Sequence, residues 1–240
     1  MARIFITGSS DGLGQLAAKR LVDGGHQVVL HARNARRAEY AMDKVPRAET
    51  VLIADLNEMD ETRKLAEDVN GLGAFDAVIH NAGVYHAPAR TIFSVNSIAP
   101  YILTCLIRKP ERLIYLSSGL HRSGTTNLKN LERDRVTYSD SKLHNLILAK
   151  AVARKWPDVF SNALEPGWVP TKMGGPGAPD DLEKGYETQV WLAVSEEARV
   201  SGRYFFHQKE APCKKEADNI EVQEAFLAKC EHITGIPFPV

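Results

Sequence analysis

The sequence predicts a single α/β domain in which a doubly wound parallel sheet of about seven strands is flanked by helices. Short aliphatic and β-branched runs alternate with longer segments of helical period, which is the pattern of parallel strands joined by crossover helices. The chain has 240 residues, of which 44% are hydrophobic and 25% charged, and this suits one globular core. A glycine-rich turn also joins the first strand to the first helix.

The elements follow from these alternations in chain order. The first helix is the clearest, because Leu13, Leu16, Ala17 and Leu21 are spaced by threes and fours before two glycines stop it. Strands are expected at residues 3–7, 27–31, 50–54, 75–80, 113–117 and 159–164. The helices between them are expected at residues 13–21, 35–44, 60–69, 93–107 and 138–155.

The last third of the chain predicts a loop, a helix, a strand and a terminal helix. Residues 167–181 contain four glycines and three prolines, so we expect an irregular loop that covers a site. A helix at 182–194, a strand at 203–206 and a C-terminal helix near 218–234 complete one domain over residues 1–240. Asp218 and Glu221 are spaced like an N-cap pair for that last helix.

Composition excludes several classes of protein. Thirty basic and thirty acidic residues cancel, so no field is predicted that would hold nucleic acid or an anionic membrane. The longest apolar stretch, at 98–107, is too short for a membrane span, and the first ten residues are interpreted as a strand and not a signal peptide. Three scattered cysteines predict a reducing, cytoplasmic setting. His121 and His144 are interpreted as surface or packing residues and not as metal ligands, so no metal site is proposed.

The glycine turn is the first motif that carries chemistry. Gly8, Gly12 and Gly14 follow the first strand with the spacing GxxxGxG and precede a helix. Glycines let the backbone approach a pyrophosphate, whose charge meets the N-terminus of the helix. This predicts a Rossmann-type dinucleotide site, and the alternative is a plain tight turn.

The end of the second strand indicates which dinucleotide binds. An acidic residue there would accept from the ribose hydroxyls of NAD, whereas an arginine suits the 2′-phosphate of NADP. The sequence reads VVLHARNARR, with Arg33 at that position and no acid before Glu39. NADP (NADPH) is therefore favoured over NAD, and the alternative is that these arginines form a solvated helix face.

Tyr138 and Lys142 form a second motif. They are four residues apart in YSDSK, so they share one face of a helix. The cation is expected to lower the pKa of the phenol from about 10 towards neutral pH, which would make Tyr138 a general acid or base. The YxxxK pattern alone is weakly specific, and its value depends on the other motifs.

Taken together, TGSSDGLG, HNAG, Asn96, the LSS that ends at Ser118, YSDSK and PGWVPT resemble the short-chain dehydrogenase/reductase family in order and position. The resemblance covers nearly the whole chain. The sequence of the helix that begins with YSDSK is most similar to those of the family branch that contains retinol dehydrogenases and bacterial ketoreductases such as daunorubicin C-13 ketoreductase.

The resemblance implies four catalytic roles. Tyr138 would exchange a proton with the substrate oxygen, and Ser118 would polarise the carbonyl. Lys142 would hold the nicotinamide ribose and tune Tyr138, while Asn96 would anchor a water in the proton relay. Ser118 is chosen over Ser117 because neighbouring strand residues point to opposite faces and the family uses the second serine.

The resemblance also implies a set of cofactor contacts. The three glycines would line the pyrophosphate, Asp55 would meet the adenine amine, Asn81 the adenosine side and Thr171 the nicotinamide amide. The whole predicted set is Gly8, Ser10, Gly12, Leu13, Gly14, Arg33, Asp55, Leu56, Asn81, Ala82, Gly83, Tyr138, Lys142, Pro166, Gly167, Val169 and Thr171.

Three positions depart from the family pattern. Only twelve residues separate Gly83 from Asn96, so the helix that carries Asn96 is expected to start late. His80 replaces the first residue of the usual Asn-Asn-Ala-Gly. Asp11 lies inside the glycine turn, where a carboxylate is unfavourable near phosphate unless it caps the helix or points outwards.

These motifs predict an NADP-dependent oxidoreductase that interconverts a ketone or aldehyde and an alcohol, with a small-molecule carbonyl or alcohol as its partner. The alternative is a non-catalytic NADP-binding regulatory or interaction protein on the same fold. Residues 84–94 and 167–181 would form the walls of the substrate pocket, and Tyr85, His121, Trp168 and Met173 suggest that it is partly aromatic and lipophilic.

A homodimer is expected through the helix at 138–155, because its two apolar rows could bury one face on the sheet and the other on a second copy. The alternative is that another part of the same chain covers the second face.

Overall fold

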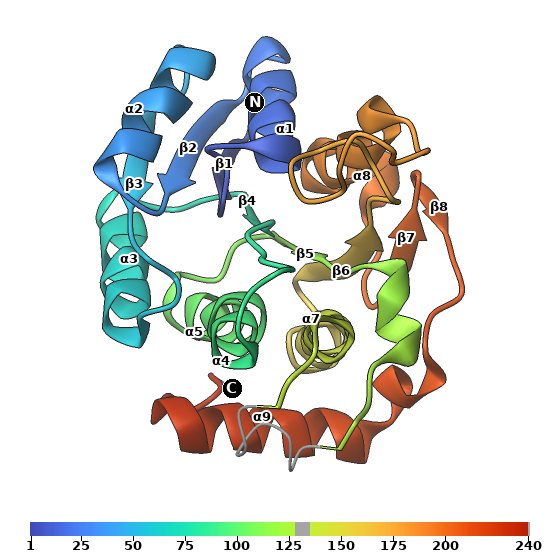
Figure 1. Ribbon diagram of the computed structural model, residues 1–240. Coiled ribbons are helices and arrows are strands. Elements are labelled where there is room, and N and C mark those ends of the chain that lie inside the picture. Colours follow the sequence, from blue (N-terminus) through green and yellow to red (C-terminus); the bar gives the residue numbers. More distant parts are fainter. Residues whose placement is uncertain (128–134, 240) are drawn as a thin grey trace.

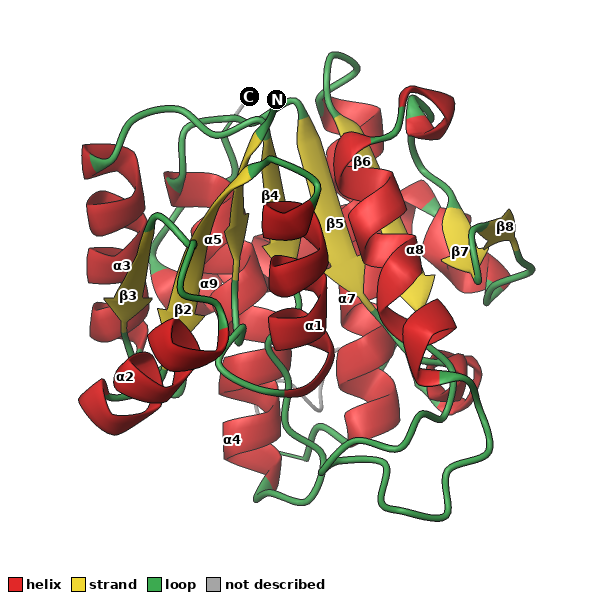
Figure 2. Ribbon diagram, turned by 90° about the horizontal axis from the view of Figure 1, so that it is seen from above, coloured by secondary structure: helices red, strands yellow, loops and turns green. Residues whose placement is uncertain are grey.

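The computed structural model describes residues 1–127 and 135–239 and contains one sheet between two layers of helices (Figures 1 and 2). The strands are β1 (Arg3–Ile6), β2 (Gln27–Ala32), β3 (Thr50–Ile53), β4 (Ala77–His80), β5 (Arg112–Leu116), β6 (Phe160–Glu165), β7 (Tyr204–Phe206) and β8 (Lys209–Glu210). Their order in space is β3-β2-β1-β4-β5-β6-β7-β8, and all pairs are parallel except the last. The predicted doubly wound fold is confirmed, with one short antiparallel edge strand in addition to the seven expected.

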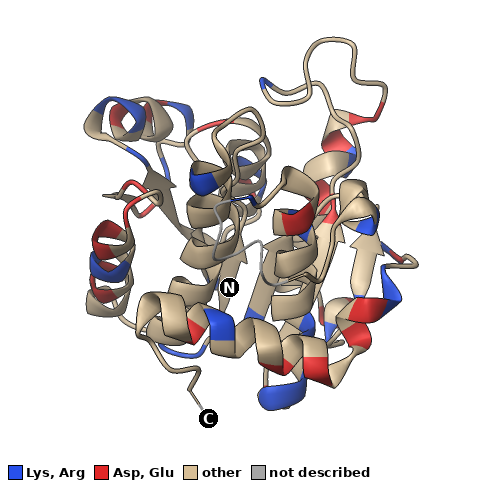
Figure 3. Cartoon of the chain, turned by 60° about the horizontal axis from the view of Figure 1, so that its bottom comes forward, with Lys and Arg blue, Asp and Glu red and all other residues tan. Residues whose placement is uncertain are grey.

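The helices cover both faces of the sheet. They are α1 (Gly12–Asp23), α2 (Ala35–Lys44), α3 (Met59–Gly71), α4 (Ala89–Phe93), α5 (Ala99–Leu106), α7 (Tyr138–Lys155), α8 (Leu182–Val194) and α9 (Ile220–Thr234). One apolar cluster packs α1, α2 and α8 on the sheet, and the other packs α3, α5, α7 and α9 on the opposite side (Figure 1). Lys and Arg as well as Asp and Glu are distributed over the helices (Figure 3). No helix within the described residues is long and apolar enough to cross a membrane.

The strand order reverses between β1 and β4, which are neighbours in the sheet but are separated by two strands in the chain. In open α/β sheets, ligands bind at the carboxyl ends of the strands where this reversal occurs, because the crossover connections leave the sheet in opposite directions there. The residues after β1, β2, β4, β5 and β6 are therefore the ones that the fold brings together.

The helix that carries Asn96 begins earlier than expected. Instead of one helix over 93–107, α4 begins at Ala89 and runs through a π-helical turn (Ser94–Ile98) into α5. Pro100 explains the irregularity: it has no N–H, so it cannot donate to the carbonyl of Asn96 four residues earlier. The expectation of a late start was wrong, since the helix begins four residues before the expected position.

The terminal helix and its surroundings correct two further predictions. Asn219 caps α9, since its side chain accepts from the backbone N–H groups of Glu221 and Val222, whereas Asp218 pairs with Lys150. The second face of α7 packs against α9 of the same chain, as Figure 1 shows. The homodimer remains a prediction, but the open face of α7 on which it depended is covered.

Candidate active site

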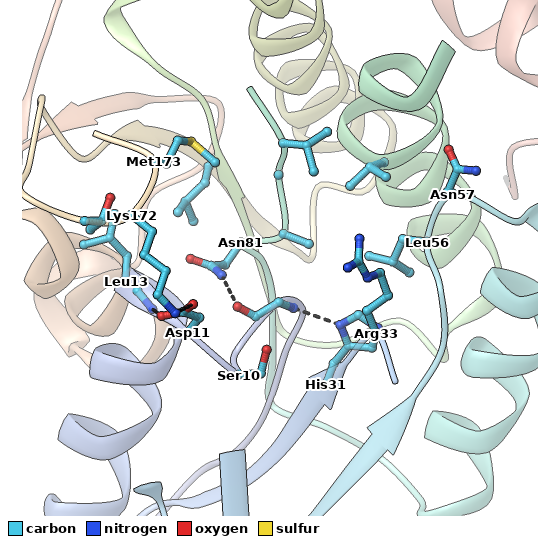
Figure 4. A pocket seen from close by; sticks show the side chains of 18 of the residues that line it. Ser10, Asp11, Leu13, His31, Arg33, Leu56, Asn57, Asn81, Lys172 and Met173 are labelled. Atoms are coloured by element: carbon cyan, nitrogen blue, oxygen red, sulfur yellow. Dashed lines mark hydrogen bonds and ion pairs between the residues drawn. The ribbon is translucent and has the colours of Figure 1, made fainter. Parts of the chain in front are cut away.

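A cavity of about 620 Å³ lies at the switch point between β1 and β4 (Figure 4). It brings together most of the residues predicted to bind a cofactor. Those that line it are Gly8, Ser10, Gly12, Leu13, Arg33, Asp55, Leu56, Asn81, Ala82, Gly83, Tyr138, Lys142, Pro166 and Thr171. Gly14, Gly167 and Val169, which were predicted with them, do not line the cavity, and neither do Ser118 and Asn96.

The glycine turn requires glycine for two different reasons. Gly8 has φ +62°, and a Cβ on it would lie 2.8 Å from the Cα of Ala82. A Cβ on Gly14 would lie 2.3 Å from the side-chain nitrogen of Asn81. Gly14 therefore packs helix α1 against the end of β4, which is why it does not reach the cavity surface.

Asn81 holds this turn in place. Its Nδ2 donates to the carbonyl oxygens of Thr7 at 2.9 Å and Gly8 at 3.1 Å, and the backbone N–H of Ala82 donates to the hydroxyl of Thr7. His80 points the other way, into the core, where its ring stacks on Tyr115 and burial lowers its pKa to about 3. The substitution of His for the family's first Asn thus leaves the turn intact.

His31 is a residue that the sequence analysis missed. Its Nδ1 accepts from the backbone N–H of Gly8 at 2.9 Å, so its Nε2 carries the proton and donates to the carbonyl of Ala54 at 3.0 Å (Figure 4). The ring is buried, and burial lowers its pKa to about 4. His31 therefore ties the glycine turn after β1 to the loop after β3 in its neutral form. The sequence signal that could have indicated this role was a polar histidine within the apolar, buried part of strand β2.

The arginines after β2 lie beside the glycine turn. Arg33 lines the cavity, and within the described residues it has no hydrogen-bond or ion-pair partner. Arg37, on the first turn of α2, donates to the hydroxyl of Ser10 at 3.4 Å. The wall therefore carries a solvated guanidinium, a second arginine and a hydroxyl, which together suit a phosphate.

Ser118 contacts Tyr138, which lines the cavity, although Ser118 itself does not line it. The hydroxyl of Ser118 hydrogen-bonds the phenol of Tyr138 and also accepts from the backbone N–H of Leu120. Ser117, by contrast, is buried and donates to the carbonyl of Lys142 at 2.8 Å, so it holds β5 against α7. Both serines follow the end of β5, and Ser117 lines the cavity whereas Ser118 does not, so the choice of Ser118 remains a prediction that rests on its contact with Tyr138.

Lys142 lies over the ring of Tyr138, with Nζ 5.5 Å from the ring centroid. Its Nζ donates to the carbonyl of Leu116 at 2.9 Å, and burial lowers the pKa of Lys142 to about 8. The predicted lowering of the phenol pKa is not found in this structure. Burial raises the pKa of Tyr138 to about 12, because desolvation outweighs the hydrogen bond from Ser118 and the ammonium points to a carbonyl instead of the phenol.

The amide of Asn96 connects three segments. Its Oδ1 accepts from the backbone N–H of Val84 at 2.8 Å, and its Nδ2 donates to the carbonyl of Val84 and to the hydroxyl of Ser141. The side chain is fully buried, and both of its polar atoms form hydrogen bonds that hold the loop after β4 against α7. Its backbone carbonyl, released from the α-helical pattern by Pro100, is the group that it can offer to the site.

The loop at 167–181 reaches over the cavity with Thr171, Lys172 and Met173. The other two predicted residues of this loop are structural: Gly167 has φ +83° beside Asp180, and Val169 is buried under Gly185.

Of the four residues expected to make the substrate pocket aromatic and lipophilic, Met173 lines the cavity, whereas Tyr85, His121 and Trp168 do not. His121 is buried between the carbonyl of Ser118 and the N–H of Lys214, and Trp168 is 59% exposed. Tyr85 contacts Tyr138 edge to face, with ring centroids 4.5 Å apart.

Comparisons with known proteins agree with this geometry. A family model described as short chain dehydrogenase matches residues 2–107. The chain is 45% identical over 257 residues to the short-chain dehydrogenase chyC of Penicillium rubens, with 100% of both chains covered. It is 27% identical to retinol dehydrogenase 14 of Mus musculus, over 97% of this chain and 86% of that protein. A solved blue fluorescent protein from a metagenomic library, in complex with NADPH, has a TM-score of 0.73 at 20% identity, over 85% of this chain and 95% of that one.

Proposed function

The chain belongs to the short-chain dehydrogenase/reductase family and is an oxidoreductase, and from this premise we propose that it uses NADPH to interconvert a ketone or aldehyde and the corresponding alcohol. One observation carries the proposal: the same cavity is lined by Arg33, which has no partner among the described residues, and by the Tyr138–Lys142 pair. The first suits an extra phosphate, and the second suits proton transfer to a carbonyl oxygen.

The backbone and side chains that line the cavity suit a dinucleotide. Any side chain at Gly8 would collide with the backbone after β4, so the turn leaves bare backbone beside the N-terminus of α1. That helix end attracts anions, and Arg33 and Arg37 add positive charge along the same wall. Thr171, which lies beside Gly12, and Lys142 also line the cavity, and they offer a hydroxyl and an ammonium that can bind an amide and a ribose.

The bound dinucleotide supplies a hydride, and the chain supplies the rest. Tyr138 carries its proton at neutral pH, since burial raises its pKa to about 12. This protonated form is the one that can donate a proton to a carbonyl oxygen during reduction. Ser118 donates a hydrogen bond to the same oxygen and holds it beside the phenol. Lys142 is fixed by the carbonyl of Leu116, so its remaining N–H groups are free to orient the ribose.

Proton replacement would use the path behind Tyr138. Lys142 Nζ and Asn96 Oδ1 both lie near Gly83, at 3.3 and 3.5 Å from the Cβ position that this glycine lacks. The released carbonyl of Asn96 gives a water a further acceptor on that path. Asn96 is thus proposed as a positioning residue for the relay, while Tyr138 is the proton donor.

A substrate panel tests the reaction. Purified protein should oxidise NADPH, which is followed by its absorbance, with at least one ketone or aldehyde. Bulky aromatic carbonyls should be included, because Met173 lines the cavity and Tyr85 contacts Tyr138. The absence of turnover on a broad panel, together with NADPH binding, would favour the alternative function of a non-catalytic NADP-binding protein.

The choice of NADPH depends on Arg33. Replacement of Arg33 by Asp is expected to weaken NADPH binding by about several-fold to a hundredfold, because a charge-assisted hydrogen bond contributes about 1.5 to 3 kcal/mol. NADH binding should change much less, since NADH lacks the 2′-phosphate. Fluorescence titration with each dinucleotide measures both.

Arg36→Asp is the matched control, because Arg36 is exposed on α2, three residues after Arg33, and does not line the cavity. It makes the same change in net charge and should leave both affinities nearly unchanged. Tighter binding of NADH than NADPH by the unmodified protein would show that the arginine argument is wrong.

A further inference from the structure

Asp11, inside the glycine turn, is bound on three sides. Its Oδ1 accepts from the backbone N–H of Gly12 at 2.8 Å, which caps α1. Its Oδ2 accepts from Lys172 Nζ at 2.5 Å and lies 3.7 Å from the guanidinium of Arg37 (Figure 4). One carboxylate oxygen therefore serves two cations that come from different loops.

All three of these side chains line the proposed cofactor cavity. Asp11 follows β1, Arg37 is on the first turn of α2, and Lys172 is on the loop that covers the cavity after β6. Burial alone would raise the pKa of Asp11, but the hydrogen bonds from Lys172 and Gly12 and the charge of Arg37 hold it below its usual value. Asp11 is therefore ionised at neutral pH.

An ionised carboxylate at this place conflicts with the ligand that the cavity fits. A dinucleotide brings several negative charges to the same wall, and like charges at short range repel each other. The conflict is removed if the carboxylate occupies the cations only while no phosphate is present. Lys172 can make that exchange, because its side chain is 76% exposed and flexible and its loop already lies over the cavity.

We propose that Lys172 is a cofactor-phosphate ligand carried by the covering loop, and that Asp11 is an internal carboxylate that binds Lys172 and Arg37 until a phosphate replaces it. This inference rests on the proposed use of a nicotinamide dinucleotide. Asp11 thereby opposes cofactor binding while keeping both cations in position. The loop at 167–181 is held across the cavity by one anion in the free protein and by another in the complex.

Two single substitutions separate this role from helix capping. Asp11→Asn keeps a good N-cap residue and removes the charge, so α1 should remain intact. It is expected to tighten NADP⁺ binding by about threefold, because removal of the competing carboxylate frees Lys172 and Arg37 from an exposed and therefore weak ion pair. Lys172→Met is expected to weaken NADP⁺ binding by about the same factor. Calorimetric titration gives both dissociation constants.

The matched control is Asp158→Asn. Asp158 also pairs with a lysine, Lys109, but both residues lie just before β6 and β5, at the opposite edge of the sheet from the cavity. This variant has the same change in net charge as Asp11→Asn and should bind NADP⁺ like the unmodified protein. If Asp158→Asn also binds NADP⁺ more tightly, the effect of Asp11→Asn is explained by net charge alone and the proposed role of Asp11 is overturned.

Hydrogen exchange of the covering loop provides a second readout that does not depend on affinity. Without cofactor, the amides of residues 172–178 should exchange faster in both Asp11→Asn and Lys172→Met, since each variant breaks the ion pair. With saturating NADP⁺, Asp11→Asn should regain the protection of the unmodified protein, because Lys172 then has its phosphate. Lys172→Met should not regain it.

The outcomes distinguish this inference from the proposed function. If the unmodified protein binds neither NADPH nor NADH, the proposed function fails. If it binds NADPH and reduces a carbonyl, but Asp11→Asn binds NADP⁺ no more tightly or Lys172→Met binds as before, only the exchange of Lys172 between two anions is overturned. Equal loss of loop protection in both variants with NADP⁺ bound would also overturn it.

Discussion

Replacement of Tyr138 by phenylalanine is expected to lower the turnover number for carbonyl reduction by about 100-fold or more, while the affinity for NADPH stays within about threefold. The change removes one hydroxyl from a ring that is otherwise packed by Tyr85 and Lys142. The hydroxyl is the proton donor in the proposed reaction, and without it the developing alkoxide has only the hydrogen bond from Ser118. Steady-state kinetics with the best substrate of the panel measures the loss.

Tyr85→Phe is the control for this variant. It removes the same atom from a ring whose centroid is 4.5 Å from that of Tyr138, so it tests whether any nearby phenol matters. Turnover should remain within about threefold, because Tyr85 is not placed to donate to the substrate oxygen held by Ser118. Unchanged turnover in Tyr138→Phe would contradict the mechanism, whatever the behaviour of Tyr85→Phe.

The fold could be predicted from sequence because local patterns decide most of it. The α7 helix was expected at its observed bounds, since the run from Tyr138 to Lys155 has helical period. The structure adds that Thr137 caps this helix. Membership of the family, including its likeness to retinol dehydrogenases, confirms the resemblance in the motifs. The π-helical turn at Asn96 was missed, although Pro100 four residues later was a readable signal.

The sequence could predict which residues form the site, but not their pKa values or their ion pairs. The glycine spacing and YSDSK located the two ends of the cavity, because each motif is contiguous in the chain. The pKa of Tyr138 was predicted in the wrong direction, since it depends on burial and on where Lys142 Nζ points. The ion pair of Asp11 with Lys172 joins residues that are 161 positions apart, and no local pattern relates them.

Lys142→Met is expected to abolish turnover and to raise the free energy of unfolding of the cofactor-free protein by about 2 to 3 kcal/mol at pH 6.5. Lys142 is buried, and no carboxylate within the described residues pairs with it, so burial lowers its pKa from 10.5 to about 8. Keeping the ammonium charged below that pH therefore costs stability in the folded state. Methionine has nearly the same shape without the charge, and the carbonyl of Leu116 keeps its hydrogen bond from Asn145.

The pH dependence has a definite sign. Between about pH 8 and 10.5 the unfolded chain holds this proton and the folded chain does not, so the stability of the unmodified protein rises with pH over that window. The penalty is complete below pH 8 and disappears near pH 10.5. The advantage of Lys142→Met should therefore be largest at pH 6.5 and small at pH 10, which urea unfolding at the two pH values measures.

Lys150→Met, on the same helix, separates this effect from the general removal of a lysine. Lys150 pairs with Asp218, so its charge is compensated, and its loss should bring no gain in stability at either pH. If Lys142→Met is instead less stable than the unmodified protein at pH 6.5, the buried ammonium is not a cost to the fold. A gain that accompanies the loss of turnover would mean that this chain retains a destabilising charge because the reaction needs it.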